Sequence, residues 1–128
     1  MRKPVASLLL LSFCVGGCKE NLSADQSTPQ SVAEIMFASA RTGKYDILKN
    51  LCSSDIDTDS DSKKVCEVSG DAALQQNFSE YFTKGKIIGE PTIDGNKAVV
   101  KILFGPDGNR EESLNLVKKD GKWFLASF

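Results

Sequence analysis

Histidine is absent from this 128-residue chain, and other features that carry chemistry are missing with it. Without an imidazole there is no common general base for neutral pH, no Ser-His-Asp triad and no His-ligated metal site. There is no glycine-rich phosphate loop, and no basic patch interleaved with aromatic residues. We therefore expect no catalysis, no cofactor, no metal and no nucleic-acid partner.

Long apolar runs are missing as well. The longest, from Val5 to Val15, has about eleven residues, whereas a membrane-spanning helix needs roughly 20. Arg2 and Lys3 precede it and two glycines follow it. A basic start, a short apolar run and small residues are typical of a secretory signal peptide.

The end of this run, Val15-Gly16-Gly17-Cys18, resembles the lipobox of bacterial lipoproteins position by position. The resemblance implies that residues 1–17 are removed and that Cys18 is lipidated and becomes the first residue. Several acyl chains on one cysteine would make a stable membrane anchor. The alternative is an ordinary signal peptide in which the cysteine is incidental.

Residues 18–28 are polar and without periodicity, which predicts a flexible tether between the lipid and a domain spanning 29–128. Lys19 follows the cysteine, whereas an Asp there resembles the inner-membrane retention signal of enteric lipoproteins. We therefore expect a lipid-anchored envelope protein on the periplasmic face of the outer membrane. After cleavage the chain carries 14 basic and 17 acidic residues. Attachment is therefore expected through acyl chains rather than through charge.

Cysteine is scarce, and only two remain after Cys14 is cleaved off and Cys18 is lipidated. In an oxidising compartment Cys52 and Cys66 are expected to form a disulfide. A metal or redox pair is the alternative, but the thirteen intervening residues do not match a CxxC motif.

Helical periodicity marks the first half of the domain. Thr28 and Pro29 predict a helix start, Ser31 with Glu34 offers a competing capping box, and Gly43 marks the end. A short second helix is expected to stop near residue 52. A third is expected over 71–84 and stopped by Gly85, with its apolar face formed by Leu74, Phe78, Tyr81 and Phe82.

Between them, residues 53–64 are polar, with aspartates at 55, 57, 59 and 61. An EF-hand loop begun at Asp55 would need glycine at its sixth position and glutamate at its twelfth, where the chain has Ser60 and Cys66. A solvated acidic loop closed by the disulfide is the favoured interpretation, and weak calcium binding is the alternative.

From Lys86 the apolar period changes to two, which predicts strands over 87–93, 97–104, 111–118 and 122–128. Gly89 and Pro91 make the first an edge or bulged strand. Helices followed by an antiparallel four-stranded meander define an α+β fold, N-terminal helices on a sheet.

The stretch Phe37 to Asp46 resembles the helix, glycine, aromatic, acidic and second-helix signature of the nuclear-transport-factor-two-like, or cystatin-like, superfamily. Residues 97–101 and 111–118, followed by Asp120-Gly-Lys-Trp123, resemble the hairpins of small bacterial lipoproteins in that superfamily. The resemblance implies a curled sheet wrapped by helices around a cone-shaped pocket. Tyr45, Asp46, Glu80 and Tyr81 are the candidate pocket residues.

Members of this superfamily include isomerases and dehydratases, and many others only bind. We expect a non-catalytic binding or accessory module for a small ligand or another envelope protein. The alternatives are a small-ligand enzyme that uses the pocket, and an immunity or exclusion lipoprotein.

Overall fold

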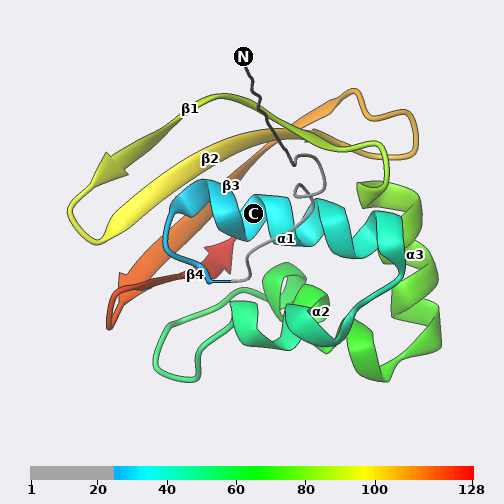
Figure 1. Ribbon diagram of the computed structural model, residues 1–128, viewed down its shortest axis with the longest axis horizontal. Helices are drawn as coiled ribbons and strands as arrows, with labels where there is room; N and C mark the ends of the chain where they lie inside the picture. Colours follow the sequence, from blue (N-terminus) through cyan, green and yellow to red (C-terminus); the bar gives the residue numbers. More distant parts are fainter. Residues whose placement is uncertain (1–24) are drawn as a thin grey trace, which may run out of the picture.

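The computed structural model describes residues 25–128. The predicted signal peptide, Cys18, Lys19 and the first part of the tether lie outside the described residues. Four strands and a series of helices make up the described part, with α1 lying across one face of the sheet (Figure 1). The helical segments are α1 (Pro29–Thr42), η2 (Asp46–Leu51), α2 (Ser60–Glu67), η3 (Val68–Gly70) and α3 (Ala72–Phe82). The strands are β1 (Lys86–Asp94), β2 (Lys97–Phe104), β3 (Arg110–Lys119) and β4 (Lys122–Ser127).

The sheet has the predicted topology. Its strands pair antiparallel in the order β1-β2-β3-β4, which confirms the meander and the α+β fold. The β1–β2 register shifts between Ile88 and Thr92, at the predicted irregularity. Gly89 supplies a φ of 71° there, which a side-chain-bearing residue rarely adopts.

The predicted start and end of α1 are confirmed. Thr28 is the N-cap, its hydroxyl accepts a hydrogen bond from the Ser31 amide at 3.1 Å, and Pro29 begins the helix. The Ser31 hydroxyl accepts a hydrogen bond from the Thr28 amide, so the capping box joins Thr28 and Ser31, and the competing box of Ser31 with Glu34 is not formed. Gly43 ends the helix with a φ of 73°.

The core lies between α1 and η2 on one side and the inner face of the sheet on the other. β2 contributes every second residue from Ala98 to Phe104, and β3 and β4 continue the same face. The largest fully buried apolar side chains are Met36, Leu48, Leu51, Ile102, Leu114, Leu116 and Leu125. Burying each such side chain contributes about 1.5–3 kcal/mol to folding, so this layer is the main source of stability.

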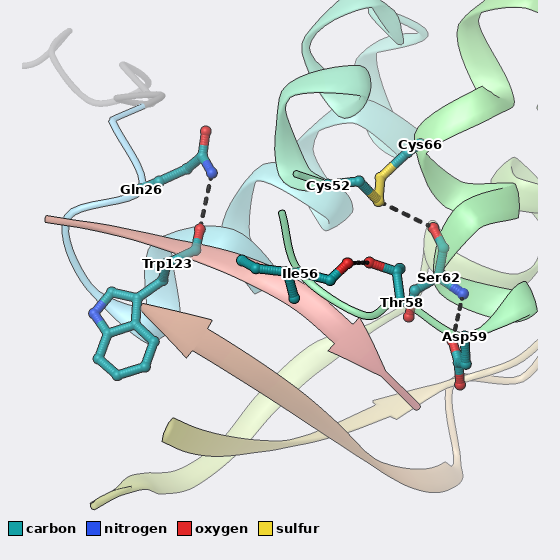
Figure 2. Close-up of a disulfide and its surroundings, with 8 residues drawn as sticks. All are labelled: Gln26, Cys52, Ile56, Thr58, Asp59, Ser62, Cys66 and Trp123. Atoms are coloured by element: carbon teal, nitrogen blue, oxygen red, sulfur yellow. Dashed lines mark hydrogen bonds between the residues drawn. A yellow bond between two sulfur atoms is a disulfide. The ribbon is translucent and has the colours of Figure 1, made fainter. Parts of the chain in front are cut away.

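The prediction of a solvated loop over 53–64 is wrong in its second half, because α2 begins at Ser60. Asp59 caps the helix by accepting a hydrogen bond from the Ser62 amide at 2.9 Å (Figure 2). Its own amide donates to the Ala126 carbonyl at 2.9 Å, which fastens the cap to β4. One acidic residue of the run therefore has a structural role.

The end of the predicted tether is also held against the sheet. Gln26 is buried, and its side-chain amide donates to the Trp123 carbonyl at 2.8 Å (Figure 2). Its backbone carbonyl accepts from the Trp123 amide at 2.9 Å. Together these bonds imitate one rung of a strand ladder on β4. The prediction that the tether extends to residue 28 is therefore wrong, because chain attachment begins at Gln26.

Candidate functional site

The four candidate pocket residues do not converge on one site. Tyr45 and Asp46 line a groove at the C-terminal end of α1, while Tyr81 lines a second groove between α2 and α3. Glu80 is exposed on α3 and lines neither of these two grooves. The four candidate residues therefore lie at three different places on the domain, and Tyr45 and Asp46 alone share a groove.

The space between α1 and the sheet, where the resemblance implied a cone-shaped pocket, is occupied by packed side chains. Val32 and Met36 of α1 and Leu48 of η2 lie in the same buried cluster as Val100 and Leu114 of the sheet, and all five are fully buried. An isolated polar group placed among them would lose its hydration without gaining a partner.

The first groove, here called the α1-end groove, has a volume of about 960 Å³. Its walls mix polar and apolar side chains: Ile35, Ala38, Ser39, Thr42, Tyr45, Asp46, Ile47, Ser69 and Gln75. The Tyr45 hydroxyl lies 2.7 Å from the Ser79 hydroxyl, and its ring packs edge-on against Phe78 at 6.2 Å. Tyr45 is thus fixed to α3 rather than to its sequence neighbour.

The two candidate carboxylates both face water. Asp46 is the first residue of η2 and Glu80 lies on the outer side of α3, and both are exposed. The Tyr45 hydroxyl is hydrogen-bonded to Ser79 and not to the neighbouring Asp46.

The second groove, here called the aromatic groove, has a volume of about 280 Å³ and is mostly apolar. It is lined by Val65, Val68, Leu74, Phe78, Tyr81, Phe82, Phe104 and Phe128, with Asp61, Lys64, Asn77 and Glu112 as its polar members. The lining comes from α2, η3, α3, two strands and the last residue of the chain. The groove opens on the same side of the sheet as the helices, since Phe104 and Glu112 both belong to the inner face.

Aromatic rings that pack against one another form the wall of the aromatic groove. The ring of Phe82 lies 4.7 Å from Phe78, 5.3 Å from Phe104 and 6.3 Å from Phe128. The Arg110 guanidinium lies 5.6 Å from the centre of the Tyr81 ring. Rings that hold one another lose little freedom when an apolar group enters beside them, so the groove is organised in advance.

Sequence reasoning placed Phe78, Tyr81 and Phe82 on one helix face but missed the groove they help to form. Phe104 and Phe128 are 24 residues apart in sequence, on β2 and at the end of the chain. Their convergence depends on how the helices meet the sheet. The one available signal was the apolar face of the third helix, which carries Phe78, Tyr81 and Phe82.

The cysteine pair is joined in a disulfide that ties the end of η2 to α2 (Figure 2). It brackets the acidic run as predicted, and closing a loop of this length is worth about 3 kcal/mol. Between residues 25 and 128, no three Cys, Asp or Glu side chains gather in an arrangement that could hold a metal ion.

One aspartate of the run, Asp55, is paired with a lysine. Its carboxylate lies 3.4 Å from the Lys119 ammonium, which lies equally close to Asp120. The hydrogen bond and charge of Asp120, and then those of Asp55, raise the pKa of Lys119. Both contacts are exposed, so they fix the β3–β4 turn only weakly.

No family model matches the chain, and no curated protein matches it in sequence. Three solved structures are similar. A candidate NTF2-like transpeptidase from Campylobacter jejuni is 18% identical with a TM-score of 0.50, covering 77% of this chain and 97% of its own. A SEC-C motif containing protein from Rhodopseudomonas palustris is 14% identical with a TM-score of 0.52, covering 80% and 77%.

The third, an NTF2-like protein of unknown function from Shewanella baltica, is 18% identical and covers 77% of this chain and 88% of its own, with a TM-score of 0.41 that carries no weight. The chain therefore has an α+β fold similar to that of NTF2-like proteins. At these identities the likeness is one of fold and says nothing of activity.

None of the helices between residues 25 and 128 combines the length and apolar character needed to span a bilayer.

Proposed function

We propose that this protein is a lipid-anchored envelope protein whose domain binds a partner and performs no chemistry. Lipidation at Cys18 attaches it to the membrane, and Lys19 directs it to the periplasmic face of the outer membrane. The partner is another envelope protein that inserts an apolar side chain into the aromatic groove.

The observation that carries the proposal is the contrast between the two grooves and the packed interior. The aromatic groove presents eight apolar side chains to a space of about 280 Å³. That space accommodates one or two large apolar side chains, and such anchors dominate the energetics of protein interfaces. The candidate carboxylates Asp46 and Glu80 lie in water instead, where no apolar surrounding prepares them for acid–base work.

The binding role is tested by filling the groove. Asn77→Trp places an indole at the groove, while Gln76→Trp adds the same side chain at an exposed neighbour outside its lining. Full-length lipidated protein is used to capture partners from envelope extracts. We expect the same partners with wild type and Gln76→Trp, and their loss with Asn77→Trp. Unchanged capture by Asn77→Trp would contradict a role for the groove.

The anchor is tested separately by mass spectrometry of the mature N-terminus. Cys18 is expected to be the first residue and to carry acyl chains, and Cys18→Ser to leave the signal peptide uncleaved by the lipoprotein peptidase. An unmodified first residue in the exported chain would contradict the anchor.

A further inference from the structure

The face of the sheet turned away from α1 has its own composition. In the β1–β2–β3 register, Lys97 lies opposite Asp94 and Val117, and Lys101 lies opposite Ile88 and Ser113. These residues alternate with the buried ones, so they all belong to the outer face. We call this surface the outer lysine face: its basic members are Lys86, Lys97, Lys101 and Lys122, and its apolar members are Ile88, Val99, Leu103, Val117 and Phe124.

The apolar members of this face are only partly covered. Val99, Val117 and Phe124 are intermediate in exposure, while the four lysines are exposed. The outer lysine face therefore presents apolar side chains close to the sheet, and longer cationic side chains surround them. The methylene chain of a lysine packs along apolar surface, while its ammonium group contacts an opposite charge or water.

Charge is unevenly distributed over the domain. Residues 25–84 contain ten acidic and six basic side chains, whereas residues 85–128 contain six acidic and seven basic ones. At the paired positions of the outer face the acidic residues are Asp94 and Glu111, and Glu90 is a further exposed acidic residue in the irregular part of β1. Lys119 is excluded from the face because Asp55 and Asp120 already pair with it. The face keeps a positive excess on a chain with a net charge of −1.

The point of chain attachment limits how far this face can be from an anchor at Cys18. Gln26 is bonded to Trp123 on β4, and only seven residues separate it from Cys18. Eight residue steps span at most about 29 Å even when fully extended. This reach is close to twice the radius of gyration of a 100-residue domain, and that radius is about 13 Å. With Cys18 anchored, the edge of the sheet at Gln26 therefore stays within about 29 Å of the bilayer.

We propose that the outer lysine face rests on the anionic phospholipid surface of the bilayer that holds the anchor. The proposal relies on the proposed lipidation of Cys18. The four lysines meet phosphate groups, and Phe124 and its apolar neighbours meet the interface between headgroups and acyl chains. The aromatic groove lies on the opposite side of the sheet, so this orientation presents it to the periplasm.

The short attachment favours lipid over an acidic protein as the occupant. A tethered face meets the surface that carries its own anchor at a high effective concentration, so individually weak contacts suffice. An acidic protein partner would have to displace that surface. It would give a different result in the experiment below, because its binding would not depend on the lipid composition.

The test uses lipidated full-length protein inserted into vesicles of phosphatidylcholine, either alone or with 30 mol% phosphatidylglycerol. Each lysine is acetylated with a membrane-impermeant reagent and its labelling rate is measured by mass spectrometry. We expect labelling of Lys97, Lys101 and Lys122 to fall at least threefold in the anionic vesicles. Labelling of Lys44, Lys49 and Lys64, which are exposed on the helical side, should not change. Salt at 0.5 M should abolish the difference in labelling between the two kinds of vesicle, because it shortens the Debye screening length to a few Å.

Equal labelling of both groups in both vesicles would overturn the proposal, and so would protection that is independent of phosphatidylglycerol. The same spectra report the mass of the N-terminal peptide. An unlipidated peptide would therefore identify a failure of the anchor itself, as distinct from a lipidated protein whose outer face stays in water.

A matched pair of variants separates the face from net charge. Lys97→Glu/Lys101→Glu/Lys122→Glu should remove the lipid-dependent protection of the remaining Lys86. Lys44→Glu/Lys49→Glu/Lys64→Glu changes the charge equally on the helical side and should leave that protection in place. Loss of protection in both variants would contradict the assignment to this face.

Discussion

The sheet and α2 are held in place by different kinds of interaction. β2 and β3 bury a continuous row of side chains on their inner face, including Val100, Ile102, Leu114 and Leu116. Along the eight residues of α2, only Ser62 and Val65 are buried. A helix this short is unstable alone in water, so its stability comes from attachments at its two ends.

Those attachments are the Asp59 cap, which is bonded to β4, and the Cys52–Cys66 disulfide. Burial therefore sets the stability of the sheet, while a cap and a covalent bond position α2. Since α2 supplies Val65 to the aromatic groove, a helix held in place at its two ends forms part of the candidate binding surface. The predictions below test this division, beginning with the largest expected effect.

Leu114→Ala should be the most damaging, because Leu114 is fully buried at the centre of β3. Removing a buried leucine side chain costs about 2–5 kcal/mol. Urea unfolding followed by circular dichroism measures the loss. The control is Lys101→Ala, because Lys101 lies on the outer face of β2 next to Val100, which pairs with Leu114. This substitution should change the free energy of unfolding by less than about 0.5 kcal/mol. Equal effects would mean that the inner face is not the core.

Replacing both cysteines, Cys52→Ala/Cys66→Ala, should lower the free energy of unfolding by about 3 kcal/mol through lost chain constraint. We expect the far-ultraviolet signal of the sheet to persist at low denaturant and capture of partners through the aromatic groove to weaken. Stability equal to that of the wild type would show that the disulfide does not constrain the chain.

Asp59→Ala should cost about 1 kcal/mol, the usual cost of losing an N-cap. Asp57 is exposed in the same acidic run, so Asp57→Ala is the matched control and should be nearly neutral. The comparison is made by thermal unfolding of both variants. If the two substitutions cost the same, Asp59 does not have the structural role assigned to it.

Ser62→Ala should have the smallest effect and its sign should be favourable or neutral. Among the side chains that the structure describes, the Ser62 hydroxyl is buried without a hydrogen-bond partner. Removing an unsatisfied buried hydroxyl relieves its lost hydration. A loss of more than about 1 kcal/mol in urea unfolding would show that this hydroxyl has a partner.

The sheet could be predicted from the sequence because its signal is local. Alternation from Ala98 to Phe104 and glycine-containing turns fixed strand boundaries and topology to within a few residues. The first helix was predictable for the same reason, since Thr28, Pro29 and Gly43 mark its ends chemically. Trp123, which follows the last turn, is buried in the core.

α2 could not be predicted from the sequence, because most of its residues are polar and because the cap that holds it is bonded to a residue distant in sequence. Asp59 bonds to Ala126, and Gln26 bonds to Trp123, across separations that no local pattern reveals. The same reason explains the candidate site. The directions of the candidate residues Tyr45, Asp46, Glu80 and Tyr81 depend on how the helices pack. Gly85 likewise serves packing, because a side chain there would collide with the Phe37 ring.

Native-state hydrogen exchange with the disulfide intact and reduced tests the division between sheet and α2 most directly. After reduction, the amides of residues 60–67 should exchange at rates close to those of unstructured peptides. The amides of β2 and β3 should stay protected by a factor of about 100 or more, since their burial does not depend on the disulfide. Simultaneous loss of protection in both regions, or continued protection of 60–67 equal to that of the sheet, would contradict the account.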